Sequence, residues 1–322
     1  MADTGVGRQV QVVASEDGEL HVPADIARLL GRNAEVEVGP GTVVTLRPAR
    51  GPAQPAIGPA QDQQPELAAT AILEVSHLSV AYGSKKAVDD VSFQVFQGEI
   101  FGLLGPNGAG KTSTLSSIEG LIKPRSGSVL LDGFDVQRHP LEAKARMGVQ
   151  LQATSFQDQL TIRQVVRLYA GLYGVTLSDL DIDEQLQVIG LAGEAAKPFK
   201  QLSGGQQQRL ALYIAVIHEP ALLLLDEPTA GLDPQSRRQL WGRIEDIRKK
   251  GGSILLTTHS MEEAQAVCDR VSIIDHGQLL TTERPLDLID KHRDDPRVRA
   301  VAHGDVTLED VFIGLTGSEV RD

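Results

Sequence analysis

A glycine-rich turn that carries one lysine and one threonine points most clearly to chemistry. Residues 99–113 read E-I-F-G-L-L-G-P-N-G-A-G-K-T-S, in which the apolar run from Ile100 to Leu104 leads into the pattern G-x-x-x-x-G-K-T. Glycines let the backbone fold so that successive N–H groups converge, and a helix that follows offers the positive end of its dipole. The sequence therefore predicts a buried strand, a loop that binds a polyphosphate, and a helix.

The side chains of this loop have separate expected tasks. Lys111 is expected to reach the terminal phosphates, and the Thr112 hydroxyl to hold a magnesium ion that bridges them. The other loop residues predicted to contact the nucleotide are Gly105, Asn107, Gly108, Ala109, Gly110 and Ser113.

The length, charge and composition of the whole chain limit the classes of protein to which such a site can belong. A length of 322 residues is large for one domain, and a formal net charge of −12 argues against a broad nucleic-acid-binding face. The single cysteine, Cys268, fits a reducing cytosol and is expected to be buried. No secretory segment opens the sequence, and apolar runs such as Ala221 to Leu225 are far shorter than the ~20 residues of a membrane span. We therefore expect a soluble chain.

Residues 1–50 predict a small unit of two strands, a helix and two more strands. The expected elements are strands near residues 10–13, 20–22, 36–38 and 43–46, with a helix over 24–30. Residues 18–31, G-E-L-H-V-P-A-D-I-A-R-L-L-G, resemble the swapped-hairpin domains of AbrB-like regulators, which are intertwined dimers and often bind DNA. Acidic residues outnumber arginines here, so the prediction favours dimerisation or a regulatory contact over DNA binding. Residues 51–70, rich in Pro, Ala and Gln, are predicted to form a linker.

Residues 71–285 alternate strand and helix patterns, and residues 286–322 follow as a C-terminal extension. From Thr161 the apolar residues recur at helical spacing, so a helical segment interrupts the sheet pattern. In the extension, Thr307 to Asp310 has the form of a capping box, and Leu308, Val311 and Phe312 fall on one helix face. Packing of that face on its own domain and contact with a partner chain both stay open.

Further motifs follow the phosphate loop in a fixed order. They are L-S-G-G-Q at 202–206, A-L-L-L-L-D-E-P at 221–228, A-G-L-D at 230–233, and His259 after a strand over 254–257. With the loop, they resemble the signature, Walker B strand, D-loop and switch histidine of ABC ATPases. The resemblance covers about residues 72–320. It implies an α/β P-loop fold of ABC type with a mixed core sheet and a helical subdomain.

The resemblance also assigns roles to single residues. Tyr82 corresponds to the aromatic residue that stacks on adenine, and Gln152 to the Q-loop glutamine near the metal and the reacting phosphate. Asp226, at the end of a buried strand, is expected to reach the magnesium ion, and Glu227 to act as general base toward the attacking water. His259 is implied to contact the γ-phosphate and to orient the same water.

The signature implies that the working unit is a homodimer. In ABC ATPases it closes on the ATP held by a second copy, so two chains enclose two nucleotides. The residues that this implies for binding the ATP held by the second copy are Ser203, Gly204, Gly205, Gln206 and Asp233.

A narrower resemblance concerns the last third of the chain. The stretches T-H-S-M-E-E-A at 258–264, C-D-R-V at 268–271 and L-E-D-V-F-I-G-L-T-G at 308–317 are similar to the daunorubicin-resistance-like branch of type-2 ABC exporters. In that branch the membrane permease is a separate polypeptide, which implies a peripheral subunit at the cytoplasmic face of the cell membrane. The alternative is a soluble ABC ATPase whose N-terminal unit contacts nucleic acid or a regulatory protein. One ATPase cassette and no heptads favour transport.

Overall fold

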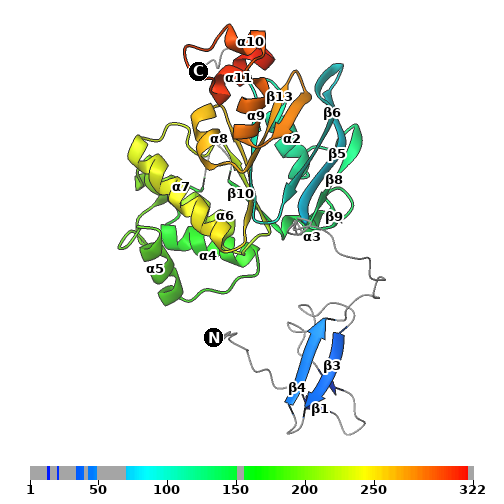
Figure 1. Ribbon diagram of the computed structural model, residues 1–322. Helices are drawn as coiled ribbons and strands as arrows, with labels where there is room; N and C mark the ends of the chain where they lie inside the picture. Colours follow the sequence, from blue (N-terminus) through cyan, green and yellow to red (C-terminus); the bar gives the residue numbers. More distant parts are fainter. Residues whose placement is uncertain are drawn as a thin grey trace, which may run out of the picture. The chain divides into compact units, whose positions relative to one another are not determined.

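The computed structural model describes residues 70–150 and 156–317, together with four short strands nearer the N-terminus. The chain divides into two compact units, residues 1–65 and 66–322 (Figure 1). In the first unit, β1 (Val13–Ala14) pairs antiparallel with β2 (Leu20–His21), and β3 (Ala34–Gly39) with β4 (Val43–Pro48). These strands overlap the predicted ones. The predicted helix over 24–30 lies outside the described residues.

The second unit is built on two sheets. The central sheet has the order β10-β11-β12-β7-β13-β14, and its first five strands run parallel. Its strands are β7 (Ile100–Leu104), β10 (Met147–Gln150), β11 (Leu222–Asp226), β12 (Ser253–Thr258), β13 (Arg270–Asp275) and β14 (Gln278–Glu283), the last antiparallel. An antiparallel sheet of order β6-β5-β8-β9 consists of β5 (Ala71–Tyr82), β6 (Lys85–Phe96), β8 (Ser126–Leu131) and β9 (Phe134–Asp135). The predicted mixed sheet is thus confirmed.

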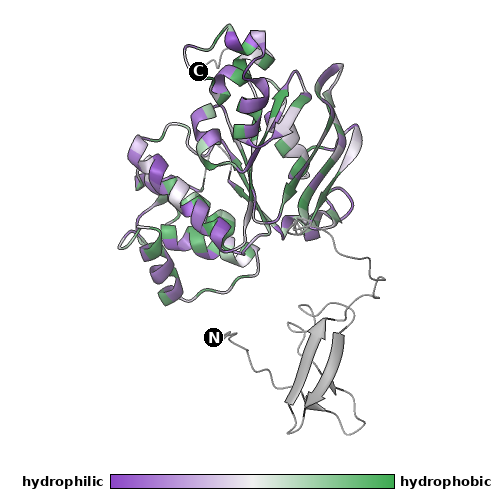
Figure 2. Cartoon of the chain, viewed as in Figure 1, coloured by the Kyte–Doolittle hydropathy of each residue, from purple (hydrophilic) through white to green (hydrophobic). Residues whose placement is uncertain are grey.

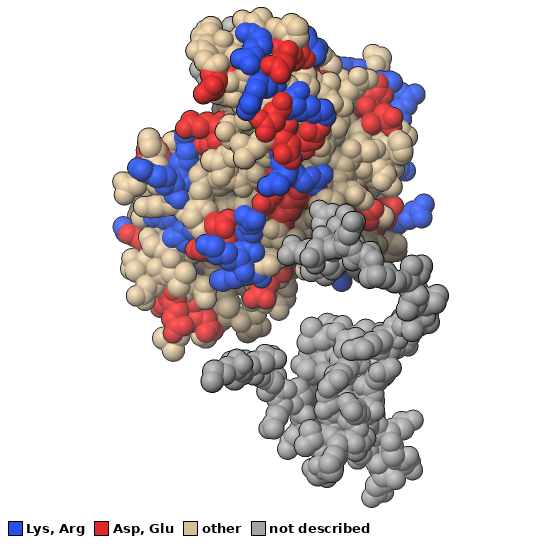
Figure 3. Space-filling view, viewed as in Figure 1, with Lys and Arg blue, Asp and Glu red and all other residues tan. Residues whose placement is uncertain are grey.

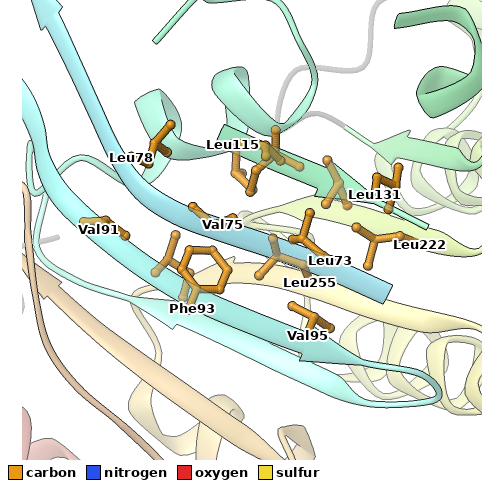
Figure 4. Packing of buried hydrophobic residues seen from close by; sticks show 14 of the residues in the cluster. Leu73, Val75, Leu78, Val91, Phe93, Val95, Leu115, Leu131, Leu222 and Leu255 are labelled. Atoms are coloured by element: carbon orange, nitrogen blue, oxygen red, sulfur yellow. The ribbon is translucent and has the colours of Figure 1, made fainter. Parts of the chain in front are cut away.

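One hydrophobic core fills the space between these sheets. Alternate residues of β5 and β6 point into it because successive side chains of a strand face opposite sides. They meet Leu115 of helix α2 (Lys111–Ile118), Leu131, Leu222 and Leu255 (Figure 4). The strand residues labelled there are Leu73, Val75, Leu78, Val91, Phe93 and Val95. Full burial of each large apolar side chain is worth roughly 1.5–3 kcal/mol, so this core fixes the helix that follows the phosphate loop.

A second core covers the other face of the parallel sheet. Its helices are α6 (Gly204–Val216), α7 (Pro234–Lys249), α8 (Met261–Val267), α9 (Pro285–His292), α10 (Pro296–Arg299) and α11 (Leu308–Thr316). Leu308, Val311 and Phe312 of α11 are fully buried with residues of β7, β11 and β12. The apolar face of the C-terminal helix therefore packs on its own unit. Cys268 is buried in the same core, as predicted.

The helical segment predicted after Thr161 forms a third core. It comprises α4 (Ile162–Leu172), α5 (Asp179–Val188), the short 3-10 helix η1 (Phe199–Gln201) and Leu210, Ala211 and Ile214 of α6, whereas α3 (Pro140–Lys144) precedes it. Thr161 and Ser178 begin α4 and α5 with reciprocal capping boxes. Apolar residues line the interior, and the outer helix faces carry polar residues together with some exposed apolar ones (Figure 2). Within residues 70–150 and 156–317, every helix is too short or too polar to cross a bilayer.

Candidate nucleotide-binding and catalytic site

A cleft of about 650 Å³ opens beside the phosphate loop, where the parallel strands end. Its walls include residues 106–108 and 110–113 of the loop, Tyr82, Asp226, Glu227 and His259. The carboxyl ends of parallel strands meet at one edge of a sheet, and this is why residues so far apart in sequence converge here. The structure thus brings together the predicted loop, Walker B pair, switch histidine and aromatic residue. Gln152 lies outside the described residues.

The phosphate loop owes its shape to its glycines. Gly108 and Gly110 have φ values of +83° and +112°, in the left-handed region that other residues rarely adopt. A Cβ on Gly110 would lie 2.5 Å from the Ala87 carbonyl oxygen. Both the backbone conformation and this close contact therefore exclude a side chain at this position. Gly110 also precedes α2, whose first turn has no side-chain cap and no acidic residue. The N–H groups of that turn are therefore oriented toward an anion in the cleft.

Lys111 lies folded over the loop that precedes it. Its Nζ donates hydrogen bonds to the carbonyl oxygens of Gly105 at 2.7 Å and Pro106 at 3.3 Å. Burial lowers the pKa of this ammonium, while the nearby carboxylates of Glu227 and Asp226 act in the opposite direction. Both bonds go to neutral carbonyls, so the positive charge is not paired within the loop and serves to attract phosphate oxygens.

One buried hydroxyl contacts both Walker B residues, Asp226 through its carboxylate and Glu227 through its backbone N–H. Asp226 is the last residue of β11 and stands in register with Thr257 of β12. Thr257 Oγ1 donates to Asp226 Oδ1 at 2.5 Å, and the Glu227 N–H donates to the same Oγ1 at 3.0 Å. Glu227 adopts a left-handed backbone with φ +46°. Sequence reasoning treated Thr257 only as part of a strand. A hydroxyl residue at a strand end, two positions before His259, was the available signal.

His259 lies beside the proposed general base. Its Nδ1 is 3.4 Å from Glu227 Oε1, and its side chain is 45% exposed whereas that of Glu227 is 15% exposed. The imidazole is thus on the open side of the cleft and the carboxylate on the enclosed side. The carboxylate and the imidazole are thus close enough for both to contact one water molecule in the cleft.

The residues at the loop fit a magnesium ion. Thr112 and Asp226 line the same cleft, and both offer the hard oxygen atoms that Mg²⁺ prefers. Thr257 occupies Oδ1 of Asp226, which leaves Oδ2 for a metal. No cluster of three or more His, Cys, Asp or Glu side chains suited to a metal occurs among residues 70–150 and 156–317. Such a sparse protein ligand set suits Mg²⁺, which keeps water and phosphate ligands.

The signature residues lie outside the cleft of their own chain. Ser203 caps α6: its Oγ accepts from the Gln206 N–H at 3.3 Å, and Gln206 Oε1 accepts from the Ser203 N–H at 2.9 Å. Gly204 is exposed and Gly205 is half-buried in the first turn of α6, which carries no acidic residue. The arrangement is a helix N-terminus whose residues do not line the nucleotide cleft of their own chain.

Asp233 is likewise outside this cleft and caps α7. Its carboxylate accepts hydrogen bonds from the N–H groups of Gln235 and Ser236 and from the Ser236 hydroxyl at 2.6 Å. The Ser236 bonds lower the pKa of Asp233 below its usual range. Within one chain this residue therefore has a structural task at a helix start.

A phosphate loop after the central strand of a parallel sheet, an Asp-Glu pair on a nearby strand and a helical insertion define a P-loop ATPase of the ABC type. Comparisons with known proteins agree with this class. The ABC transporter family profile matches residues 88–230. The solved "Structure of ATP binding subunit of ABC transporter" superposes with a TM-score of 0.67 at 28% identity, covering 76% of this chain and 99% of that one.

Curated relatives give the same result. The Nod factor export ATP-binding protein I of Cupriavidus pinatubonensis is 34% identical over 307 residues, which is 80% of this chain and 94% of that protein. Its counterpart from Sinorhizobium fredii is 41% identical over 221 residues, 68% of this chain and 64% of that protein. The linearmycin resistance ATP-binding protein LnrL of Bacillus subtilis is 34% identical over 235 residues, 72% of this chain and 76% of that protein. The chain belongs to the ATP-binding proteins of ABC transporters and is an ATPase.

Proposed function

We propose that this chain is the ATP-hydrolysing subunit of an ABC exporter, which drives a separate membrane permease from the cytoplasmic face of the cell membrane. The observation that carries the proposal is the convergence of Lys111, Asp226, Glu227 and His259 on one cleft. Export as the direction is supported by the relatives, two of which are named for Nod factor export and one for linearmycin resistance.

The chain's own residues can perform most of the hydrolysis. Lys111 and the N–H groups at the start of α2 bind the terminal phosphates. Glu227 accepts the proton of the attacking water, and His259 orients that water from the open side of the cleft. A magnesium ion held by Thr112 and Asp226, with Gln152 as a further proposed ligand, would neutralise phosphate charge. Tyr82, 53% exposed at the cleft, presents its ring for stacking on adenine.

The proposed working unit is a homodimer that closes around ATP. The start of α6, with Ser203 to Gln206, does not line its own nucleotide cleft and bears no acidic residue in its first turn. A second copy can therefore present the γ-phosphate of its bound ATP to this helix start. Asp233, which follows the Walker B strand in the sequence, is proposed to take part in the same contact. ATP then holds two chains together, and hydrolysis releases them.

Contact with the permease is proposed at the helical segment after Gln152. Leu168 and Leu172 of α4, and Tyr173 directly after the helix, are large apolar side chains that are 42%, 70% and 40% exposed. Adjacent exposed apolar groups on one short helix are typical of a surface that another protein covers. Closure of the ATPase dimer would move this segment and the bound permease together.

We assign residues 1–50 to an AbrB-like unit that dimerises, residues 51–70 to a linker, residues 71–285 to the ATPase domain and residues 286–322 to its extension. A dimer of the first units would bring two ATPase domains to a local concentration roughly in the millimolar range. Nucleic acid is not a proposed partner, because acidic and basic side chains are interspersed on the visible face of the ATPase unit (Figure 3) and the net charge is negative.

Replacement of the general base tests the ATPase mechanism. Glu227→Gln is expected to abolish hydrolysis while ATP binding stays within about twofold, since the amide keeps the shape but cannot accept the proton. Glu309→Gln, at an exposed position of α11, is the matched control. Rapid hydrolysis by Glu227→Gln would remove Glu227 from the mechanism.

Purification from membranes tests the transport role. The full chain is expected to co-purify in detergent with an integral membrane protein, and substitution of Leu172 by Asp is expected to reduce that recovery. Retention of DNA or RNA that salt removes, with no membrane protein, would favour the alternative of an ABC ATPase with a nucleic-acid-contacting N-terminal unit.

A further inference from the structure

The Thr257 side chain occupies a special position between the two carboxylate residues of the site. Thr257 is fully buried near the end of β12, where it pairs in register with Asp226 of β11 on one side and Leu103 of β7 on the other. Residues in register on adjacent parallel strands direct their side chains to the same face of the sheet. The threonine hydroxyl and the Asp226 carboxylate therefore meet at the edge from which the cleft opens.

The hydrogen bonds of this hydroxyl connect both carboxylate residues. A hydroxyl has one proton to donate, and here it goes to Asp226 Oδ1 at 2.5 Å. The same oxygen accepts from the Glu227 N–H at 3.0 Å, and the Thr257 carbonyl oxygen accepts from that N–H at 3.2 Å. One residue thus fixes the rotation of the Asp226 carboxylate and holds the Glu227 amide from two sides.

Glu227 depends on such support because of its backbone. Its φ of +46° lies in the left-handed region, which disfavours residues with a Cβ. Strained conformations of this kind persist only where the surroundings determine them. The two hydrogen bonds from the Glu227 N–H to Thr257 hold this backbone conformation, and they direct the glutamate side chain toward the cleft.

We propose that Thr257 is a positioning residue for ATP hydrolysis. It holds Asp226 so that Oδ2 faces the metal, and it holds Glu227 so that the carboxylate faces the attacking water. This inference rests on the proposed roles of Asp226 and Glu227. It goes beyond them because it assigns a task to a fully buried residue that does not line the cleft.

Other buried hydroxyls provide matched comparisons. Thr258, the next residue, accepts from the Ser260 N–H at 3.0 Å. Ser272 of β13 is fully buried and shares a 2.5 Å hydrogen bond with Thr282 of β14, remote in the sheet order from β11. Ser272→Ala therefore removes a buried hydroxyl and a bond of equal length without altering the proposed site.

The experiment compares Thr257→Val, Thr257→Ala, Thr257→Ser and Ser272→Ala in the full chain. The assays are steady-state ATPase kinetics, binding of a fluorescent ATP analogue with and without Mg²⁺, and thermal unfolding. Supporting groups of this kind alter metal affinity or activity by about 10–100-fold. We expect kcat to fall at least about tenfold in the Val and Ala variants, and the Mg²⁺ concentration for half-maximal binding to rise several-fold. Binding without Mg²⁺ should stay within about twofold.

The conservative variant and the control separate positioning from mere stability. Thr257→Ser keeps the hydroxyl and is expected to restore kcat and the Mg²⁺ dependence, whereas Ser272→Ala should change the melting temperature without changing either. Unchanged kcat and Mg²⁺ dependence in Thr257→Val and Thr257→Ala would overturn the proposal, as would losses that Thr257→Ser does not rescue. Hydrolysis by Glu227→Gln in the same assay would instead contradict the proposed general base.

Discussion

The glutamate at the end of the phosphate-loop helix gives a quantitative test of the fold. Glu119 follows α2 and is 7% exposed. Burial is the main cause that raises the pKa of Glu119 from 4.5 to about 7, the Asp226 charge adds to it, and Lys144 opposes it. The substitution Glu119→Gln keeps the shape of the side chain and removes its charge.

The raised pKa of Glu119 determines the direction and the size of the change in stability with pH. Because the native state binds the Glu119 proton more tightly than the unfolded chain does, the associated stability is fully present below pH 4.5 and is lost as pH rises through about 7. At about 1.36 kcal/mol for each tenfold change in proton affinity, the full rise corresponds to roughly 3.4 kcal/mol. Screening by nearby solvent reduces this figure, and we expect about 1.5 kcal/mol.

Urea unfolding without nucleotide at pH 5 and pH 8 measures the effect. Glu119→Gln should be about 1.5 kcal/mol more stable than the wild-type chain at pH 8, and the difference should be clearly smaller at pH 5, close to the unfolded-state pKa of 4.5. Glu142→Gln, at an exposed position of α3, is the control. The difference between its free energy of unfolding and that of the wild-type chain should be the same at pH 5 and pH 8. A difference for Glu119→Gln that is the same at both pH values, or of opposite sign at pH 8, would refute the reasoning.

Two further substitutions test the second core and the region behind the switch histidine. Phe312→Ala should lower the free energy of unfolding by about 3–5 kcal/mol in a urea titration, because this ring is fully buried against the sheet; a loss below ~1 kcal/mol would mean that α11 is not held there. Glu263→Ala should cost about 1–3 kcal/mol, because the buried carboxylate accepts from the Thr229 hydroxyl at 2.6 Å and pairs with Arg237 at 2.9 Å. Glu262→Ala at the exposed neighbouring position should change little, and equal losses in both variants would contradict that account.

The sequence was sufficient for the parts of the site that are contiguous. The phosphate loop and the Asp226-Glu227 pair could be located because local pattern, strand end and residue type coincide in one stretch. The helices from Thr161 onward were predictable from their apolar spacing. Thr257 was missed because its function depends on the register between β11 and β12, strands about thirty residues apart. Glu119 was missed because the burial of a helix end depends on tertiary packing.

The buried cysteine makes the chain convenient for spectroscopy. Cys268 is the single cysteine among the 322 residues. The pKa of its thiol is raised, and burial is the main cause. Alkylating reagents attack the thiolate, so this side chain should stay unlabelled under mild conditions. A cysteine introduced at an exposed position such as Glu309 would then carry the only fluorophore or spin label. Distances within the proposed dimer could be followed through the ATP cycle without first removing any native residue.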